Sequence, residues 1–271
     1  MNDQGPLWPV GDTSAIECVE NILAYIGRVS DPELRAAFVG EKLLALTDDN
    51  VVRAVTLIHR RAREADHGAL DAWSVLANPR TLAERLDAYR RSRVFHCATR
   101  LGVREVVALF SKGRPARTSA RSDEDFLIYG MADQTVGRRV SKARETDRET
   151  RAKIMYDADP RVIEAYLQNT RTTEADVVRV AARRPSSPVI LETIYRSPRW
   201  ITRYTVKLAL ARNPYTPENL ANNLLPHLRL PDLLEIQDDR SLGDSVRENA
   251  GKFIESRRAL RAGPARDDGG A

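Results

Sequence analysis

The most chemically suggestive feature of the sequence is a concentration of cations around one tryptophan. Arg196, Arg199, Arg203 and Lys207 recur at steps of three and four, and Trp200 stands among them. If one helix is continuous through these positions, its surface carries a basic stripe. Guanidinium groups make charge-assisted hydrogen bonds to carboxylates and phosphates. The pattern therefore predicts a surface that binds anionic groups of a partner.

The candidate binding residues extend into the neighbouring segments, because Arg183 and Arg184 end the preceding helical pattern and Tyr215 offers a second aromatic ring. The predicted partner-binding residues are Arg179, Arg183, Arg184, Arg196, Arg199, Trp200, Arg203 and Tyr215. Two alternatives stay open. The arginines can form a solvated face that pairs with nearby carboxylates, and Trp200 can pack between repeat units instead of stacking on a ligand.

Charge is unevenly distributed along the chain. The formal net charge is +5, but residues 161–212 hold 10 basic and 4 acidic side chains, whereas residues 213–256 hold 4 and 8. A basic block followed by an acidic block is typical either of a polarised binding surface or of ordinary solvated helix faces.

The residue types that perform catalysis do not gather into a recognisable motif. The four histidines, His59, His67, His96 and His227, are far apart, and no two stand at helical i, i+4 spacing. The 14 glycines form neither a phosphate-binding loop nor a dinucleotide fingerprint. Cys18 and Cys97 are the only cysteines and are interpreted as small core residues. We therefore predict no catalytic residue, no cofactor and no metal, and a protein that is not an enzyme.

Composition indicates a folded protein in the cytoplasm. Hydrophobic residues make up 42% and charged residues 30% of the 271 positions. No apolar run reaches the roughly 18 residues that a membrane helix needs. The first 12 residues have neither the basic flank nor the apolar core of a secretion signal.

The first half of the chain is predicted to be helical without a clear repeat. Residues 1–12 are expected to be a flexible lead and residues 13–110 an N-terminal helical region. Apolar residues at three- and four-residue steps predict a helix from Ser14 to Val29 and another from Thr81 to Leu101. Asp31-Pro32 predicts a helix start, because proline suits the first helical position.

Two segments are predicted to lack packed structure. Residues 111–124 combine glycine, proline, serine and arginine without an apolar anchor, so we expect a mobile basic connector there. Residues 259–271 are expected to be a disordered tail.

Residues 125–258 carry recurring helix signals. Thr146 with Glu149 and Thr173 with Asp176 are spaced as capping boxes. Proline-marked starts then recur after 38 to 44 positions: Asp159-Pro160 with Ser197-Pro198, Thr172-Thr173 with Thr216-Pro217, and Pro188 with Pro231. Three helices in about 40 residues is the period of helical solenoids. The pattern predicts stacked repeats ending in a cap helix from about Asp244 to Arg258.

The segments that separate the predicted helices resemble those of known repeat families. The Asn169-Thr170 break with Thr172 and the Asn213-Pro214 break with Thr216 resemble leucine-rich-repeat-variant units, and the second half resembles α-solenoids of the HEAT and armadillo kind. Segments 181–185, 198–200 and 212–217 also resemble a group of bacterial proteins of unassigned function. The resemblance covers about residues 131–254. It implies an all-α fold with a right-handed solenoid after a helical N-terminal half. The variant prototype binds an iron–sulfur cluster through cysteines, which this chain lacks.

Function follows from the architecture only by analogy. The first expectation is a scaffold or adaptor that binds another protein through the helical-repeat surface. The alternative is binding of the nucleic-acid phosphate backbone by the same arginines together with those of the connector. A third hypothesis is a HEAT-like DNA glycosylase that uses Trp200, Asp176 and the arginines.

Overall fold

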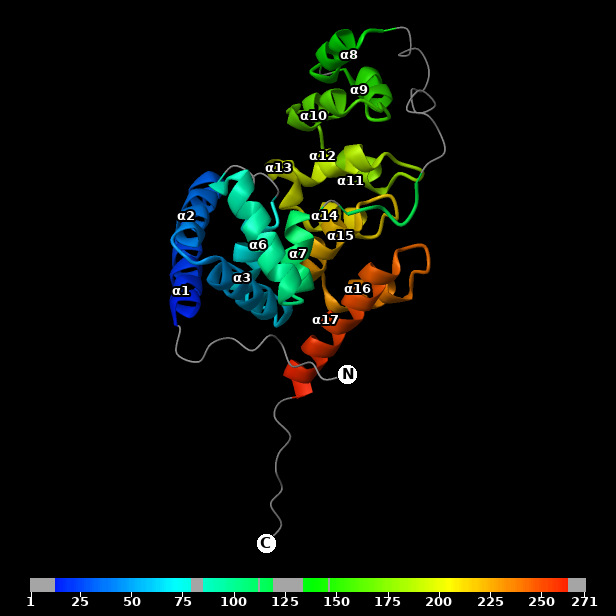
Figure 1. Ribbon diagram of the computed structural model, residues 1–271. Coiled ribbons are helices and arrows are strands. Elements are labelled where there is room, and N and C mark those ends of the chain that lie inside the picture. Colours follow the sequence, from blue (N-terminus) through cyan, green and yellow to red (C-terminus); the bar gives the residue numbers. More distant parts are fainter. Residues whose placement is uncertain (1–12, 79–84, 112, 119–133, 146, 263–271) are drawn as a thin grey trace. The chain divides into compact units, whose positions relative to one another are not determined.

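The structure of the protein is a computed structural model, which describes residues 13–78, 85–111, 113–118, 134–145 and 147–262. The described chain is all-helical, with one isolated β-bridge and no strand (Figure 1). It divides into two compact units. Unit 1 comprises the described parts of 1–111, 229–234 and 249–271, and unit 2 those of 112–228 and 235–248.

Unit 1 is built on a shared apolar core. Its helices are α1 (Ser14–Ile26), α2 (Pro32–Leu44), α3 (Asp48–Arg63), α4 (His67–Leu76), α6 (Ala88–Arg100) and α7 (Arg104–Phe110). The helix α3 packs against α1, α4 and α6, so it lies at the centre of the unit. Trp73, Ile22 and Ile58 are among the largest fully buried side chains. Burial of a large apolar side chain contributes about 1.5–3 kcal/mol, which makes this core the main support of the unit.

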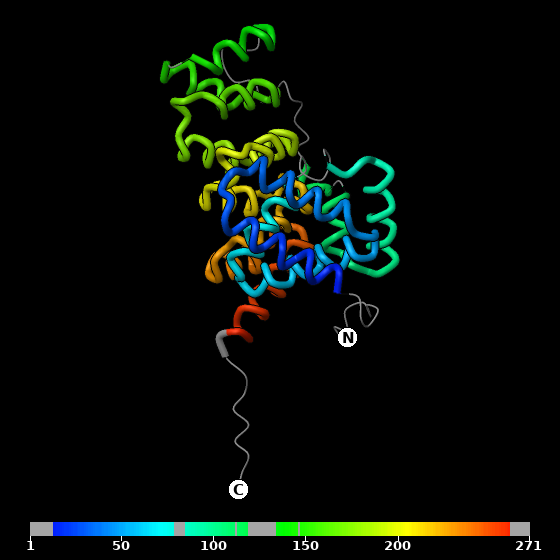
Figure 2. The backbone as a smooth tube through the Cα atoms, turned by 90° about the vertical axis from the view of Figure 1, so that its left-hand side faces the viewer, coloured from blue at the N-terminus to red at the C-terminus, as the bar shows by residue number. Residues whose placement is uncertain are grey.

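Unit 2 is a succession of short helices. They are α8 (Val136–Ala143), α9 (Arg148–Ile154), α10 (Pro160–Gln168), α11 (Glu174–Ala182), α12 (Pro188–Tyr195), α13 (Pro198–Ile201), α14 (Tyr204–Ala211) and α15 (Glu218–Leu224), followed by the 3₁₀ turn η2 (Leu225–His227). The helices α16 (Leu230–Asp238) and α17 (Asp244–Ala262) each contribute to both units. Within unit 2, α8 packs on α10, α10 on α12, and α11 on α14. Figure 2 shows these helices following one another in chain order.

Several helix starts lie where the sequence predicts them. Proline occupies the first position of α2, α10, α12 and α13. Asp31 caps α2 by accepting from the backbone N–H groups of Glu33 and Leu34, at 2.8 and 2.9 Å. Thr173 and Asp176 form the predicted capping box of α11. An N-cap of this kind contributes about 1 kcal/mol.

Other boundaries differ from the prediction. The helix α6 begins at Ala88, where the Asp87 carboxylate caps it by accepting from Arg90 N–H at 2.8 Å. The start expected at residue 81 lies among residues 79–84, which are outside the described part. The capping box expected at residue 146 also involves a residue outside the described part. Asp147 caps α9 instead, by accepting from Thr150 N–H at 2.7 Å. The lead 1–12 and residues 263–271 of the tail are likewise not described. Residues 259–262, predicted from the sequence to be disordered, are instead helical, because α17 continues to Ala262.

Two turns of unit 2 are built in the same way. Asn169 and Asn213, 44 positions apart, are 7% and 1% exposed. Each donates from Nδ2 to two carbonyls at the end of an earlier helix and accepts a backbone N–H two residues on. Three residues later, Thr172 and Thr216 donate their hydroxyls to the Tyr166 and Leu210 carbonyls. The repetition inferred from sequence thus has an atomic counterpart at these two turns.

Candidate partner-binding surface

Trp200 lies inside unit 2 and not on a binding surface. Its side chain is 3% exposed, and its Nε1–H donates to the Leu167 carbonyl at 2.8 Å. The ring therefore links α13 to the end of α10. A tryptophan buried with its N–H satisfied is a packing residue. The ring is therefore not accessible for stacking on a base.

Arg199 joins the same internal arrangement. Its guanidinium lies 4.4 Å from the Trp200 ring centroid, and its Nη1 and Nη2 donate to the Asn169 and Thr172 carbonyls at 3.1 and 3.4 Å. The side chain thus closes the first asparagine turn. Although the residue retains solvent exposure, its hydrogen-bonding capacity is directed into the fold.

Arg183 and Arg184 also donate to backbone carbonyls. Arg183 Nη1 donates to the Tyr156 carbonyl at 3.1 Å, and its guanidinium lies 5.6 Å from the Tyr156 ring centroid. Burial lowers the pKa of Arg183 below its usual value. Arg184 donates to the carbonyl of Arg212, the last residue before the second asparagine turn. Both arginines therefore stabilise connections between helices.

The remaining arginines face solvent and pair with nearby carboxylates. The side chains of Arg179, Arg196 and Arg203 are 69%, 45% and 59% exposed. Their ion-pair partners are Asp176, Glu192 and Glu174 respectively. Exposed pairs of this kind contribute about 0–1 kcal/mol each, so the arginines remain available to a partner at little cost.

The condition for the predicted stripe, one continuous helix, is not met, because the helix is interrupted at residues 196–197 and 202–203. The helix α12 ends at Tyr195, α13 covers only Pro198–Ile201, and α14 begins at Tyr204. Arg196 consequently caps the end of α12, Arg199 lies in α13, and Arg203 precedes the first residue of α14. Tyr215 is half-buried in the second asparagine turn, where its backbone N–H donates to Asn213 Oδ1 at 3.0 Å.

The predicted connector is only partly as expected. In its described part, Glu218 N–H donates to the Arg114 carbonyl at 3.1 Å, and Arg117 N–H donates to the Pro214 carbonyl at 3.0 Å. An isolated antiparallel bridge joins Pro115 to Pro217. Residues 113–118 are therefore held against residues 214–218 within unit 2, in contrast to the mobile connector that their composition predicts. The reason is that backbone groups make these bonds, and composition does not reveal them.

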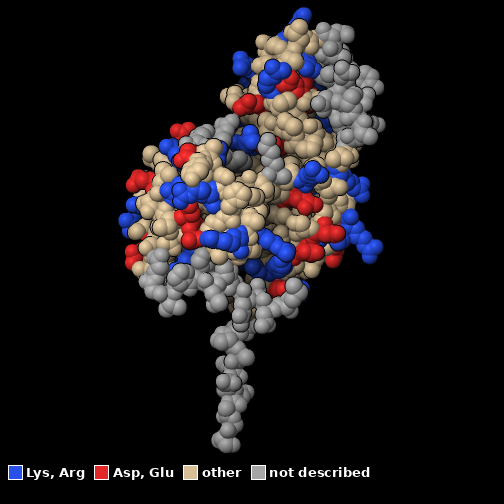
Figure 3. Space-filling view, viewed as in Figure 1, with Lys and Arg blue, Asp and Glu red and all other residues tan. Residues whose placement is uncertain are grey.

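Acidic and basic groups alternate over the surface seen in Figure 3, where blue and red side chains are interspersed. Of the eight predicted binding residues, Arg179, Arg196 and Arg203 combine high exposure with a surface ion pair. Long basic tracts are what follow a phosphate backbone, whereas mixed charge suits another protein surface.

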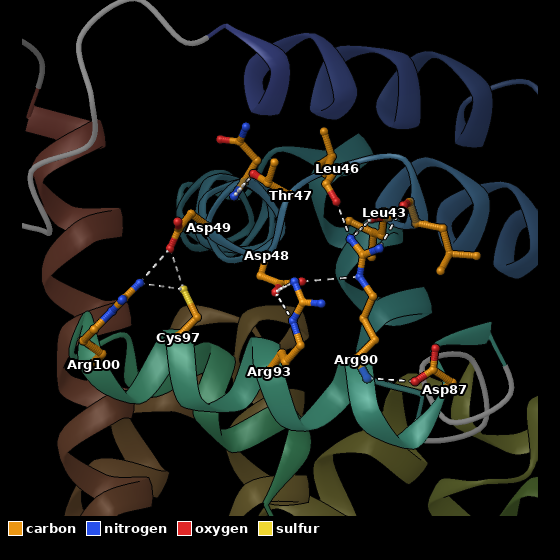
Figure 4. Close-up of polar contacts among 12 residues, drawn as sticks. Leu43, Leu46, Thr47, Asp48, Asp49, Asp87, Arg90, Arg93, Cys97 and Arg100 are labelled. Carbon is orange, nitrogen blue, oxygen red and sulfur yellow. Dashed lines mark hydrogen bonds and ion pairs between the residues drawn. The ribbon is translucent and has the colours of Figure 1, made fainter.

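Unit 1 contains a polar cluster that the sequence pattern does not reveal (Figure 4). Arg90 of α6 donates to the Leu43, Leu44 and Leu46 carbonyls at the end of α2. Asp48 at the start of α3 pairs with Arg93 Nε at 2.6 Å and with Arg90 Nε at 3.4 Å. The cluster thus connects the end of α2 and the start of α3 to α6.

Cys97 belongs to this cluster but is not activated. Its thiol donates to Asp49 Oδ1 at 2.8 Å, and Arg100 Nη2 donates to the same oxygen at 3.1 Å. Burial, together with the Asp49 carboxylate, raises the pKa of Cys97 to about 11. A reactive cysteine requires a lowered pKa. Cys97 and Cys18 are both buried, as their interpretation as core residues requires.

His59 occupies an aromatic site in unit 1. Its ring centroid lies 4.6 Å from that of Trp73 and 5.8 Å from that of Phe253. Burial, followed by the charge of Arg63, lowers the pKa of His59 from 6.5 to about 3. The folded protein therefore holds this histidine neutral. The unfolded state takes up a proton at this histidine below pH 6.5, whereas the folded state does so only near pH 3. The contribution of His59 to the free energy of unfolding is therefore complete above pH 6.5 and is lost as the pH falls toward 3.

We expect this effect to appear as acid sensitivity. Between pH 6 and pH 4 the His59 contribution to the free energy of unfolding should fall by about 1.4 kcal/mol per pH unit. Urea denaturation at pH 7, 6, 5 and 4 should show a smaller decrease for His59→Leu than for the wild type. His67→Gln, at an exposed histidine, is the matched control. Equal slopes for the wild type and His59→Leu would contradict the assignment.

In the described ranges, no group of three or more His, Cys, Asp or Glu side chains is placed to hold a metal ion. No helix in the same ranges is long and apolar enough to cross a membrane.

The fold and these contacts define an all-α protein with two equivalent asparagine turns in its second unit. No protein-family model, curated protein or solved structure matches the chain.

Proposed function

We propose that unit 2 is a right-handed α-solenoid of the HEAT, armadillo or leucine-rich-repeat-variant kind and that it binds another protein. The chain is then a non-enzymatic scaffold or adaptor of the cytoplasm. The observation that carries this proposal is the repeated asparagine turn, in which the same side chain fixes the end of an earlier helix twice. Stacked helix pairs of this kind present extended surfaces to partners without any catalytic group.

The binding residues of this proposal are the solvent-facing arginines Arg179, Arg196 and Arg203. Their carboxylate partners lie at 3.8 Å for Arg179 and Arg203, so a partner's acidic side chain can replace them with closer geometry. The surface is supported by hydrogen bonds to backbone carbonyls from Arg183, Arg184, Arg199 and Trp200. Charge complementarity at such a rim mainly changes the association rate and its salt dependence.

Nucleic-acid binding is the second hypothesis and uses the same three arginines. It receives less support, because Arg183, Arg184 and Arg199 donate to backbone carbonyls instead of facing a phosphate backbone. The glycosylase hypothesis receives less still, since Trp200 is 3% exposed.

The test is a pull-down from native lysate with the wild type and the Arg179→Glu/Arg196→Glu/Arg203→Glu variant, with and without nuclease. The matched control is Arg28→Glu/Arg60→Glu/Arg104→Glu, which makes the same charge change at exposed positions of unit 1. We expect a protein that survives nuclease, is retained by the control and is lost from the unit 2 variant. Capture of nucleic acid would favour the second hypothesis, and equal capture by all three chains would exclude these arginines.

A further inference from the structure

Residues 113–118, called the strap here, lie along residues 214–218, the acceptor edge. The strap is extended across the edge through two backbone hydrogen bonds, from Glu218 N–H to the Arg114 carbonyl and from Arg117 N–H to the Pro214 carbonyl. The bridge between Pro115 and Pro217 lies between them in sequence. Pairing of an extended segment with an exposed backbone is a recurrent mode of peptide recognition.

Gly113 sets how closely the strap approaches. A Cβ atom at this position would lie 2.2 Å from Asn219 Oδ1 and 2.7 Å from the Asn219 backbone nitrogen. The backbone nitrogen cannot move aside as a flexible side chain can. The acceptor edge therefore admits glycine at this position of the bound segment and excludes every residue with a side chain.

The strap is held by its backbone more than by its side chains. Arg114, Ala116, Arg117 and Thr118 are exposed, while Pro115 is half-buried. Little apolar area is therefore removed from water when the strap docks, and its affinity for the edge must be modest. A segment of similar backbone shape but with better side-chain contacts can displace it.

The charges of the two segments are complementary. The strap contains two arginines and no acidic residue. Glu218, the last residue of the edge, faces the loop at Gly243 and Asp244, because a Cβ on Gly243 would lie 1.8 Å from Glu218 Oε1. Burial raises the pKa of Glu218, and the Asp244 carboxylate raises it further, so a nearby cation is favourable. Asp244 also pairs with Arg247, through one contact at 2.8 Å.

We propose that the acceptor edge binds an extended basic peptide of a partner protein, with glycine at the position of Gly113, and that the strap occupies this site as an intramolecular competitor. The inference rests on the proposed protein-binding function and names both the class of partner and its regulation. A tethered segment has an effective concentration of about 1 mM. If the strap occupies the edge for about nine-tenths of the time, only about one-tenth of the molecules can bind a free peptide. The apparent affinity for that peptide is then lowered about tenfold.

The experiment uses the full chain and two matched glycine substitutions. Gly113→Ala creates the clash with Asn219 and should release the strap, whereas Gly137→Ala adds a methyl group where nothing lies within 4 Å. A labelled peptide with the sequence of residues 111–118 is titrated into each chain and followed by fluorescence anisotropy. Hydrogen exchange at the Arg117 and Glu218 amides reports whether the strap is docked.

We expect the peptide to bind Gly113→Ala at least about tenfold more tightly than the wild type or Gly137→Ala. The same peptide with alanine in place of its glycine should not bind, and Glu218→Lys in the Gly113→Ala background should weaken binding. Amide exchange at Arg117 and Glu218 should be faster in Gly113→Ala than in Gly137→Ala. These results together would establish both the edge as a peptide site and the strap as its competitor.

Three results would overturn the inference. One is unchanged amide exchange in Gly113→Ala, which would mean that the strap does not require glycine. Another is faster exchange without saturable peptide binding. The third is dimerisation of Gly113→Ala by mutual exchange of straps, which would make a second copy the occupant. Because the titration uses purified protein and a synthetic peptide, its failure leaves the lysate result, and with it the proposed function, standing.

Discussion

Asp157→Ala is expected to lower the free energy of unfolding by about 3–5 kcal/mol, because it leaves a buried guanidinium without its counter-ion. Asp157 Oδ2 lies 3.3 Å from Arg139 Nη1, and the two side chains are 2% and 7% exposed. Asp157 also accepts the Asp159 backbone N–H at 2.9 Å, at the start of α10. Thermal or urea denaturation of the full chain measures the loss.

The matched control is Glu149→Ala, which breaks the Lys153–Glu149 pair in the same unit. Those side chains are 47% and 78% exposed. An exposed i,i+4 pair contributes about 0.3–0.5 kcal/mol, so the control should change stability little. If Asp157→Ala costs no more than Glu149→Ala, the Arg139–Asp157 contact is not a buried ion pair.

The double variant Arg139→Met/Asp157→Ala distinguishes two quantities: the cost of leaving Arg139 buried without a counter-ion, and the net contribution of the Arg139–Asp157 pair to stability. Burial raises the pKa of Asp157 above its usual 3.8 despite the attraction of Arg139. The folded state therefore binds the proton more tightly than the unfolded state, and ionisation above pH 3.8 costs stability. The pair as a whole contributes little net free energy, so Arg139→Met/Asp157→Ala should recover most of the stability that Asp157→Ala loses.

Local signals explain which parts of the fold were predictable. The start of α2 depends on Asp31 and Pro32, whose effects act within three residues. The capping box of Thr173 and Asp176 is equally local. The recurrence of an asparagine followed three residues later by a threonine identified the two equivalent turns, because this signal is also local. Such signals need no knowledge of tertiary contacts.

The candidate surface was less predictable because its contacts span long sequence separations. Arg199 donates to carbonyls 27 and 30 residues earlier, and Trp200 donates to one 33 residues earlier. A helical pattern of cations contains no information about such partners. Nor does it reveal the break at Thr202 and Arg203, where no proline or glycine interrupts the chain. Arg179, Arg196 and Arg203 could be assigned to solvent only from the structure.

Asn213→Asp should destabilise the protein by about 3 kcal/mol or more, because a carboxylate keeps the shape of the side chain but cannot donate. Asn213 Nδ2 donates to the Ala181 and Arg183 carbonyls at 2.7 and 2.9 Å, at the end of α11. The substitution places a charged acceptor against both carbonyls at a site that is 1% exposed. Chemical denaturation of the full chain gives the free energy directly.

The equivalent turn provides an internal replicate. Asn169 Nδ2 donates to the Ala143 and Glu145 carbonyls at 2.9 and 2.8 Å, so Asn169→Asp should cost a similar amount. Gln168→Glu makes the same chemical change at the adjacent exposed position and should cost less than about 1 kcal/mol. Similar losses at both asparagines would show that the two turns carry equal weight in unit 2. A large loss at only one would mean that the second turn is a sequence repeat without the energetic role of the first.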